Sequence, residues 1–260
     1  MRLRRVTIRS VSESIKSVFG LLRSLLIYRR PGRQRALRRF YRPFMQPGAP
    51  VFDIGAHLGD RASAFAALGA RVVALEPQPR LFRWLERLTR RSGRVTCLPL
   101  AAGARPGRLQ LTSSRANPSV ASLSPSWREQ VRGAQAGFAA VDWDEQLSVE
   151  VTTLDALIER YGEPAFCKID VEGFEAEVLA GLSRPLAALS LEFVQGALDR
   201  ALACVERLEA LGCYRYQVVA GEQRRFFLKD WIEATELRDW LESGAGGLSS
   251  GDLYARLRSS

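Results

Sequence analysis

The fold prediction starts from the stretch Val51-Phe52-Asp53-Ile54-Gly55-Ala56-His57-Leu58-Gly59-Asp60. A short apolar run ends in an acid and a glycine, and a tight turn then leads into a helical segment. Glycines let the backbone approach a ligand closely, and the free N–H groups at a helix N-terminus favour anionic groups. The spacing is D-x-G-x-x-x-G, whereas a dinucleotide site has G-x-G-x-x-G. The turn therefore argues against a nicotinamide-dependent oxidoreductase.

From residue 50 onward, segments with strand and helix periodicity alternate along the chain. This alternation predicts an α/β fold with a doubly wound, mostly parallel sheet. Two last segments, Tyr214–Val219 and Arg224–Leu228, predict a C-terminal antiparallel hairpin. The other predicted strands are 51–54, 71–75, 95–100, 165–171 and 186–194, and the predicted helices are 61–68, 79–90, 154–161, 174–182 and 198–211.

Acidic residues follow several predicted strands at their carboxyl ends. Glu76 follows the second strand, where an acid can accept hydrogen bonds from both hydroxyls of a ribose. Asp170 and Glu172 lie at the carboxyl end of the fourth strand. Open α/β sheets bind their ligands at this edge. Together with Asp53, these acids predict a site for a nucleoside-containing cofactor.

The motifs taken together resemble the FkbM family of S-adenosylmethionine (SAM)-dependent methyltransferases. The resemblance covers about residues 50–195 and depends on the order and spacing of the motifs. It implies a Rossmann-like class I methyltransferase fold, SAM as cofactor, and methyl transfer, commonly to a hydroxyl of a sugar or natural product. It leaves the acceptor open. The matching pieces are FDIGAHLGD (52–60), ALEP (74–77), NPSVASL (117–123), VTTLD (151–155), KIDVEGFEAEVLAGL (168–182) and Leu191-Glu192.

The resemblance also implies which residues contact the cofactor. Asp53 would hold the methionine end, and Glu76 the ribose. The third strand lacks the acid that many relatives place on adenine, so backbone groups and packing near Ala101 would recognise the base. The full predicted cofactor set is Asp53, Gly55, His57, Gly59, Glu76 and Ala101.

The predicted catalytic residues are Asp170 and Glu172. The methyl group of SAM is electrophilic, but an alcohol acceptor must still lose its proton, and a nearby carboxylate can take it. Capping of the following helix is the alternative role for both acids. His57, the one histidine of the chain, is expected to contact the cofactor rather than to act as a base. Asp170 with Glu192 does not complete a metal ligand set, so no metal is expected.

Positive charge is concentrated at the start of the chain. Residues 1–45 contain 13 basic side chains and one acidic one, a net charge of +12, whereas the remainder carries a net charge of −2. Apolar residues in 11–28 have helical spacing, and Val18–Tyr28 is too short to span a bilayer. Such an arm can contact an anionic membrane surface or nucleic acid, or can simply be solvated.

These patterns predict three regions: a basic helical arm over 1–45, a methyltransferase domain over 46–241, and a flexible Gly/Ser-rich tail over 242–260. Residues 103–148 would form an insertion that serves as a lid or a substrate-binding element. The four cysteines lack metal spacing and indicate reduced thiols in a cytoplasmic protein, peripheral at the inner membrane face if the arm binds lipid. The oligomeric state is left open.

A small-molecule or glycan acceptor is the expected partner. One alternative is a nucleic-acid methyltransferase that uses the basic arm. It is disfavoured, because no base-handling Asn-Pro-Pro-Tyr motif is present and the body of the chain is slightly acidic. A second alternative is a membrane-associated protein that binds SAM without turnover, since retained cofactor residues do not prove catalysis.

Overall fold

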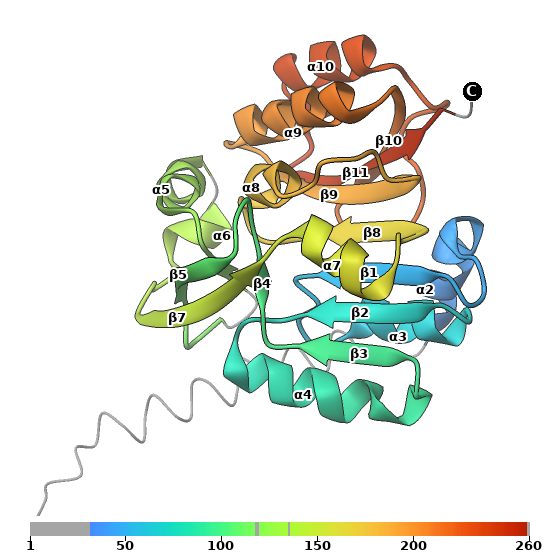
Figure 1. Cartoon of the computed structure of the whole chain (residues 1–260). Coiled ribbons are helices and arrows are strands. Elements are labelled where there is room, and N and C mark those ends of the chain that lie inside the picture. The colour runs from blue at the N-terminus through green and yellow to red at the C-terminus, as the bar shows by residue number, and fades with distance from the viewer. Residues whose placement is uncertain (1–31, 118–119, 135, 259–260) are drawn as a thin grey trace, which may run out of the picture.

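The computed structural model describes residues 32–117, 120–134 and 136–258. Its centre is a seven-stranded sheet with the order β10-β11-β9-β8-β1-β2-β3 (Figure 1). The strands are β1 (Pro50–Ile54), β2 (Arg71–Leu75), β3 (Val95–Leu98), β8 (Phe166–Ile169), β9 (Ala188–Val194), β10 (Tyr214–Ala220) and β11 (Ser250–Leu257). β11 is antiparallel to both neighbours, and the pairs from β9 to β3 are all parallel. The predicted Rossmann-like class I methyltransferase fold is confirmed.

The chain order reverses between β1 and β8, because β2 and β3 lie on one side of β1 and β9 on the other. A crevice at the carboxyl ends of the strands is expected at such a switch point. The register places Asp53 beside Lys168, so the residues that follow these strands meet at one edge of the sheet.

Helices cover both faces of the sheet. One apolar cluster joins its strands to α7 (Leu154–Tyr161), α8 (Glu175–Ala180), α9 (Leu198–Leu211) and α10 (Ala234–Glu242). A second cluster on the other face includes side chains of α2 (Arg33–Tyr41), α3 (Asp60–Ala67) and α4 (Pro79–Thr89). Short 3₁₀ turns occur at Arg42–Phe44, Arg90–Ser92 and Ala245–Gly247. No helix within the described part of the chain is long and apolar enough to cross a membrane.

The predicted insertion has a fold of its own. It forms most of a four-stranded sheet with the order β4-β7-β5-β6, beside the carboxyl edge of the main sheet (Figure 1). Its elements are β4 (Ala101–Ala102), β5 (Gly107–Ser113), β6 (Ala121–Ser122), α5 (Pro125–Ala134), α6 (Ala136–Ala139) and β7 (Glu145–Thr152).

The C-terminal antiparallel pair is confirmed, but the partner of β10 is β11 rather than Arg224–Leu228. The segment 224–228 reaches β10 through a single bridge between Val219 and Phe226. The prediction of a flexible tail over 242–260 is therefore wrong for residues 250–257. Glycine and serine mark the turn before β11, whereas Leu253, Tyr254 and Ala255 are buried inside the sheet.

The predicted boundary of the arm at residue 45 is also displaced. Leu37 and Tyr41 of α2 are buried in the domain, and the Tyr41 ring packs edge-on against Phe65 with ring centroids 4.8 Å apart. The packed domain thus includes α2, which sequence composition had grouped with the arm. The predicted amphipathic helix over 11–28 lies outside the described residues.

Candidate active site

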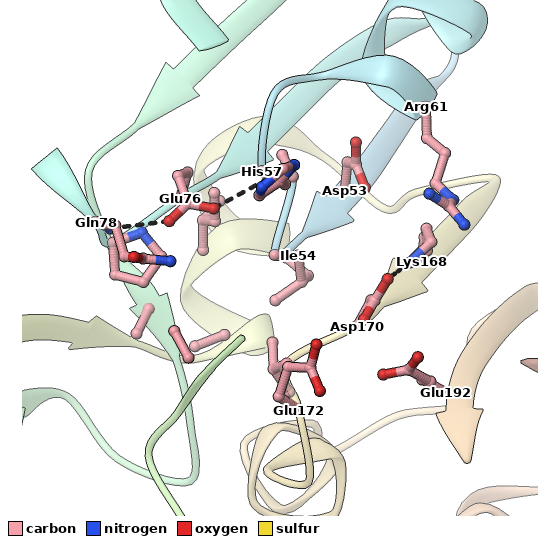
Figure 2. A pocket seen from close by; sticks show the side chains of 18 of the residues that line it. Asp53, Ile54, His57, Arg61, Glu76, Gln78, Lys168, Asp170, Glu172 and Glu192 are labelled. Carbon is pink, nitrogen blue, oxygen red and sulfur yellow. Dashed lines mark hydrogen bonds and ion pairs between the residues drawn. The ribbon is translucent and has the colours of Figure 1, made fainter. Parts of the chain in front are cut away.

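A cavity of about 260 Å³ opens at the switch point, at the carboxyl ends of β1, β2 and β8 (Figure 2). Nearly all residues predicted from the sequence line it. Its walls come from β1, β2, β8, β9 and the insertion. The predicted residues in its lining are Asp53, Gly55, His57, Glu76, Ala101, Asp170 and Glu172.

Gly59 does not belong to this lining. It is the N-cap residue that precedes α3, its φ is +75°, and a Cβ there would lie 2.6 Å from Leu85 Cδ1. Its lack of a side chain allows α3 and α4 to pack closely. The structure therefore gives Gly59 a packing role and places it away from the cavity.

Gly55 brings two strand ends together. Its φ is 82°, and a Cβ at this position would lie 1.8 Å from the carbonyl oxygen of Asp170. Only glycine allows the turn after β1 to lie against the backbone that follows β8. The same turn places the backbone N–H of His57 toward Glu76. Burial lowers the pKa of the His57 imidazole to about 4, so this ring is neutral and a weak base.

Glu76 is oriented by two backbone donors. Its Oε2 accepts a hydrogen bond from His57 N at 3.0 Å, and its Oε1 accepts one from Gln78 N at 2.9 Å. Each carboxylate oxygen keeps a second lone pair that can accept another hydrogen bond. The side chain is 3% exposed, and burial raises its pKa to about 7 although both backbone donors lower it.

Asp53 is a buried carboxylate without a hydrogen bond of ordinary geometry to any described residue. It is 1% exposed; the backbone of Ala62 interacts with it, but no donor reaches either oxygen with ordinary hydrogen-bond geometry. Burial raises its pKa to about 6, while Lys168 and Arg61 lower it. Burying a carboxylate without a well-formed hydrogen bond costs free energy of folding. The arrangement therefore suits a ligand that brings a cationic donor of its own.

Lys168 forms an ion pair that the sequence analysis did not assign. Its Nζ lies 2.5 Å from Oδ2 of Asp170, and its side chain is 1% exposed. Burial would raise the pKa of Asp170, but Lys168 and then Arg61 outweigh it and hold that pKa at about 2. The pair could have been found from its i, i+2 spacing, which places both side chains on one face of a strand.

Three carboxylates gather where the cavity meets the segment after β8. One oxygen from each of Asp170, Glu172 and Glu192 lies within 4.8 Å of the others. Burial, and then the charge of Asp170, raise the pKa values of Glu172 and Glu192. Among the described residues this is the one group close enough to hold a metal ion. The sequence analysis named Glu192 as part of a family motif and as one member of an incomplete set of metal ligands, but not as a site residue.

Glu172 is held in a strained backbone conformation. Its φ is +54°, which costs about 1–3 kcal/mol for a residue with a side chain. Ser122 of the insertion donates a hydrogen bond to the Glu172 carbonyl at 2.6 Å. Glu175 accepts from the backbone N–H groups of Val171 and Gly173. The insertion therefore helps to fix the loop that carries Glu172.

The helix-capping alternative for the two acids does not match the structure. α8 begins at Glu175 after Phe174, and no side chain caps its first turn. Asp170 pairs with Lys168 instead, and both acids line the cavity.

Comparisons with known proteins bear on this cavity. The profile of the methyltransferase FkbM domain matches residues 53–243. A curated relative, the hexuronic acid methyltransferase AglP of Haloferax volcanii, is 30% identical over 149 residues. The match covers 56% of this chain and 54% of AglP, so the chain spans about half the length of that relative.

Two solved structures are similar over most of the chain. The precorrin-6y C5,15-methyltransferase of Geobacter metallireducens is 14% identical, with a TM-score of 0.46 and 86% of each chain covered. The O-methyltransferase of Bacillus cereus in complex with SAH is 11% identical, with a TM-score of 0.45. The similarity covers 98% of this chain and 94% of the Bacillus cereus chain. Both TM-scores lie below 0.5, so these likenesses add nothing to the family match.

Proposed function

Because the chain belongs to the FkbM family of SAM-dependent methyltransferases, we propose that it methylates a hydroxyl oxygen of a sugar or natural-product acceptor. The observation that carries this proposal is the group of carboxylates formed by Asp170, Glu172 and Glu192 beside the cavity. Carboxylates accept hydrogen bonds from hydroxyl groups and can take up their protons. A hydroxyl acceptor supplies a donor for Oε2 of Glu192, which has no hydrogen-bond partner among the described residues.

The cofactor residues fit SAM on two observations. The Glu76 carboxylate is fixed by backbone donors and keeps free lone pairs, as contacts to two ribose hydroxyls require. The buried Asp53 carboxylate has no hydrogen bond of ordinary geometry among the described residues, so it can accept one from the α-ammonium group of SAM. Ala101 lines the cavity without a polar side chain, which agrees with recognition of adenine by packing. When bound, SAM supplies a methyl group that is already electrophilic.

Asp170 and Glu172 orient the acceptor in this proposal. Lys168 keeps Asp170 ionised, so its carboxylate accepts a hydrogen bond from the acceptor hydroxyl at any physiological pH. A carboxylate of such low pKa is a weak base, so its proton uptake has to accompany methyl transfer rather than precede it. Glu172, whose pKa is raised, is the stronger base when it is ionised. Holding the hydroxyl in line with the methyl group supplies much of the acceleration.

A sugar acceptor is supported by the relative AglP, whose name describes a hexuronic acid methyltransferase. A uronic acid offers both hydroxyls and a carboxylate, so the chemical outcome has to be measured. The test incubates the protein with methyl-labelled SAM and a panel of neutral sugars, uronic acids and hydroxylated natural products. Alkali removes a methyl ester but leaves a methyl ether.

Label that survives alkali on one acceptor class would support O-methylation of a hydroxyl. Label that alkali releases would show a carboxylate acceptor and contradict the proposal, as would label found only on nitrogen or carbon. Parallel reactions with EDTA and with added Mg²⁺ test the acidic group. We propose that no metal is needed, because Lys168 already balances the charge of Asp170.

A further inference from the structure

Arg61 is a second, partly buried cation in the cavity wall, and neither the family motifs nor the proposed chemistry uses it. It is the second residue of α3, directly after the glycine turn, and it lines the cavity. Its side chain is 16% exposed, and its Nε is buried without a hydrogen-bond partner among the described residues. An arginine donor left in this state calls for an acceptor from a ligand.

The ion pair that Arg61 forms leaves its Nε without a hydrogen-bond acceptor among the described residues. Arg61 Nη2 lies 3.2 Å from Oε1 of Glu222, but that carboxylate is 52% exposed. Glu222 also pairs with Arg33 at 3.1 Å and with Arg224 at 3.4 Å. One solvent-exposed carboxylate thus faces three guanidinium groups. Arg33 is also paired with Asp60 at 2.6 Å, whereas the Nε of Arg61 stays available to an acceptor in the cavity.

A complementary buried group lies in the same part of the cavity. Figure 2 shows Asp53 and Arg61 together at one end, with Glu76 and Gln78 at the other end. Among the described residues, neither the Asp53 carboxylate oxygens nor the Nε of Arg61 has a hydrogen bond of ordinary geometry. Lys168 is already engaged with Asp170. The Asp53 carboxylate and the Arg61 guanidinium both have hydrogen-bonding atoms left over. Together they match a ligand that carries both an ammonium and a carboxylate group.

We propose that Arg61 binds the α-carboxylate of the methionine portion of SAM, next to the α-ammonium at Asp53. The inference builds on the proposed placement of the cofactor, with its ribose at Glu76. Guanidinium groups form strong charge-assisted hydrogen bonds with carboxylates. Arg61 therefore makes the protein select cofactors that retain the carboxylate.

Calorimetry with two ligands tests this assignment. S-adenosylhomocysteine (SAH) carries both charged groups, and its decarboxylated analogue keeps the ammonium but lacks the carboxylate. The unaltered protein is expected to bind SAH about 10- to 100-fold more tightly than the analogue. In Arg61→Met this ratio should fall to about one through weaker binding of SAH, while affinity for the analogue changes little.

Two further variants separate recognition from structure. Glu222→Gln removes the ion-pair partner and should keep the preference for SAH. Arg61→Lys keeps the charge without the guanidinium fork and should retain a reduced preference, which also serves if Arg61→Met does not fold. Thermal unfolding midpoints monitor folding in each case.

The result that overturns the inference is an unchanged SAH preference in folded Arg61→Met or in Arg61→Lys. An equal loss of both ligands in Arg61→Met and Glu222→Gln would also overturn it, because Arg61 would then only hold the Glu222 segment in place. If the unaltered protein binds neither ligand, the cofactor placement itself fails and the inference fails with it.

Discussion

Glu76 gives the most direct test of the cofactor placement at the level of single residues. Losing two charge-assisted hydrogen bonds to ribose in Glu76→Ala should cost about 2–4 kcal/mol of binding free energy. Titration calorimetry with SAM measures this loss. Arg83→Ala on α4 is the control, because that exposed residue is absent from the cavity lining. Equal SAM affinity in both variants would remove Glu76 from the site.

The pH dependence of SAM binding follows from the same acids. Burial raises the pKa of Glu76 to about 7 and that of Asp53 to about 6. Both accept hydrogen bonds from the ligand more strongly when they are ionised, so affinity should rise as pH increases from about 5.5 to 8. In Glu76→Gln the step near pH 7 should disappear, while the step near pH 6 remains. Affinity that is flat across this range would contradict the assigned roles.

Asp170 should matter for turnover more than for SAM affinity. Asp170→Asn keeps the shape of the side chain but removes its charge, and kcat should fall about 10²–10⁴-fold. SAM affinity should stay within a few-fold, since the acid is proposed to act on the acceptor. The change also leaves Lys168 buried without its partner, so unfolding must be measured alongside. A folded variant with the original kcat would exclude Asp170 from catalysis.

At the level of elements, β11 is expected to contribute strongly to stability. Leu253 is buried within the main apolar cluster, so Leu253→Ala should lower the free energy of unfolding by about 2–5 kcal/mol. Arg256→Ala on the same strand is exposed and should change it by about 0.5 kcal/mol or less. Chemical denaturation measures both. Similar small effects would show that residues 250–257 do not form part of the core.

The sequence was sufficient for the elements with regular patterns and for the acids that follow them. Asp53 lies near the carboxyl end of β1, Glu76 and Asp170 follow β2 and β8, and these parallel strands end at one edge of the sheet. β11 was missed because its glycine and serine neighbours resemble a tail and its apolar run is short. Arg61 and Glu192 were not assigned as site residues, because their roles depend on which strands and helices become neighbours, and local pattern does not specify that.

At the level of the whole molecule, the domain should separate from the first 31 residues. A chain that begins at Gly32 keeps α2 and should bind SAM with unchanged affinity. A chain that begins at Pro43 loses the buried side chains of Leu37 and Tyr41, and should be less stable by about 3–6 kcal/mol. Calorimetry and denaturation check the two outcomes. Loss of SAM binding on removal of residues 1–31 alone would make the arm part of the site.

Residues 1–31 contain eight basic side chains and one acidic one. We propose that they contact an anionic membrane surface, and sedimentation with phosphatidylglycerol vesicles tests this. The full chain should bind the vesicles in low salt, and the chain from Gly32 should not. Salt-dependent binding to RNA without vesicle binding would instead favour the nucleic-acid alternative.

The position of β11 also affects how the protein is made. β10 pairs with β11 alone in the sheet, and β9 has β11 as its outer neighbour. While a ribosome synthesises residues 195–249, the nascent chain therefore carries the unpaired outer edge of β9, and β10 has no partner when it emerges. Open strand edges invite pairing with other chains. Protection by a chaperone is most needed in this interval, and it ends when residues 250–257 enter the gap.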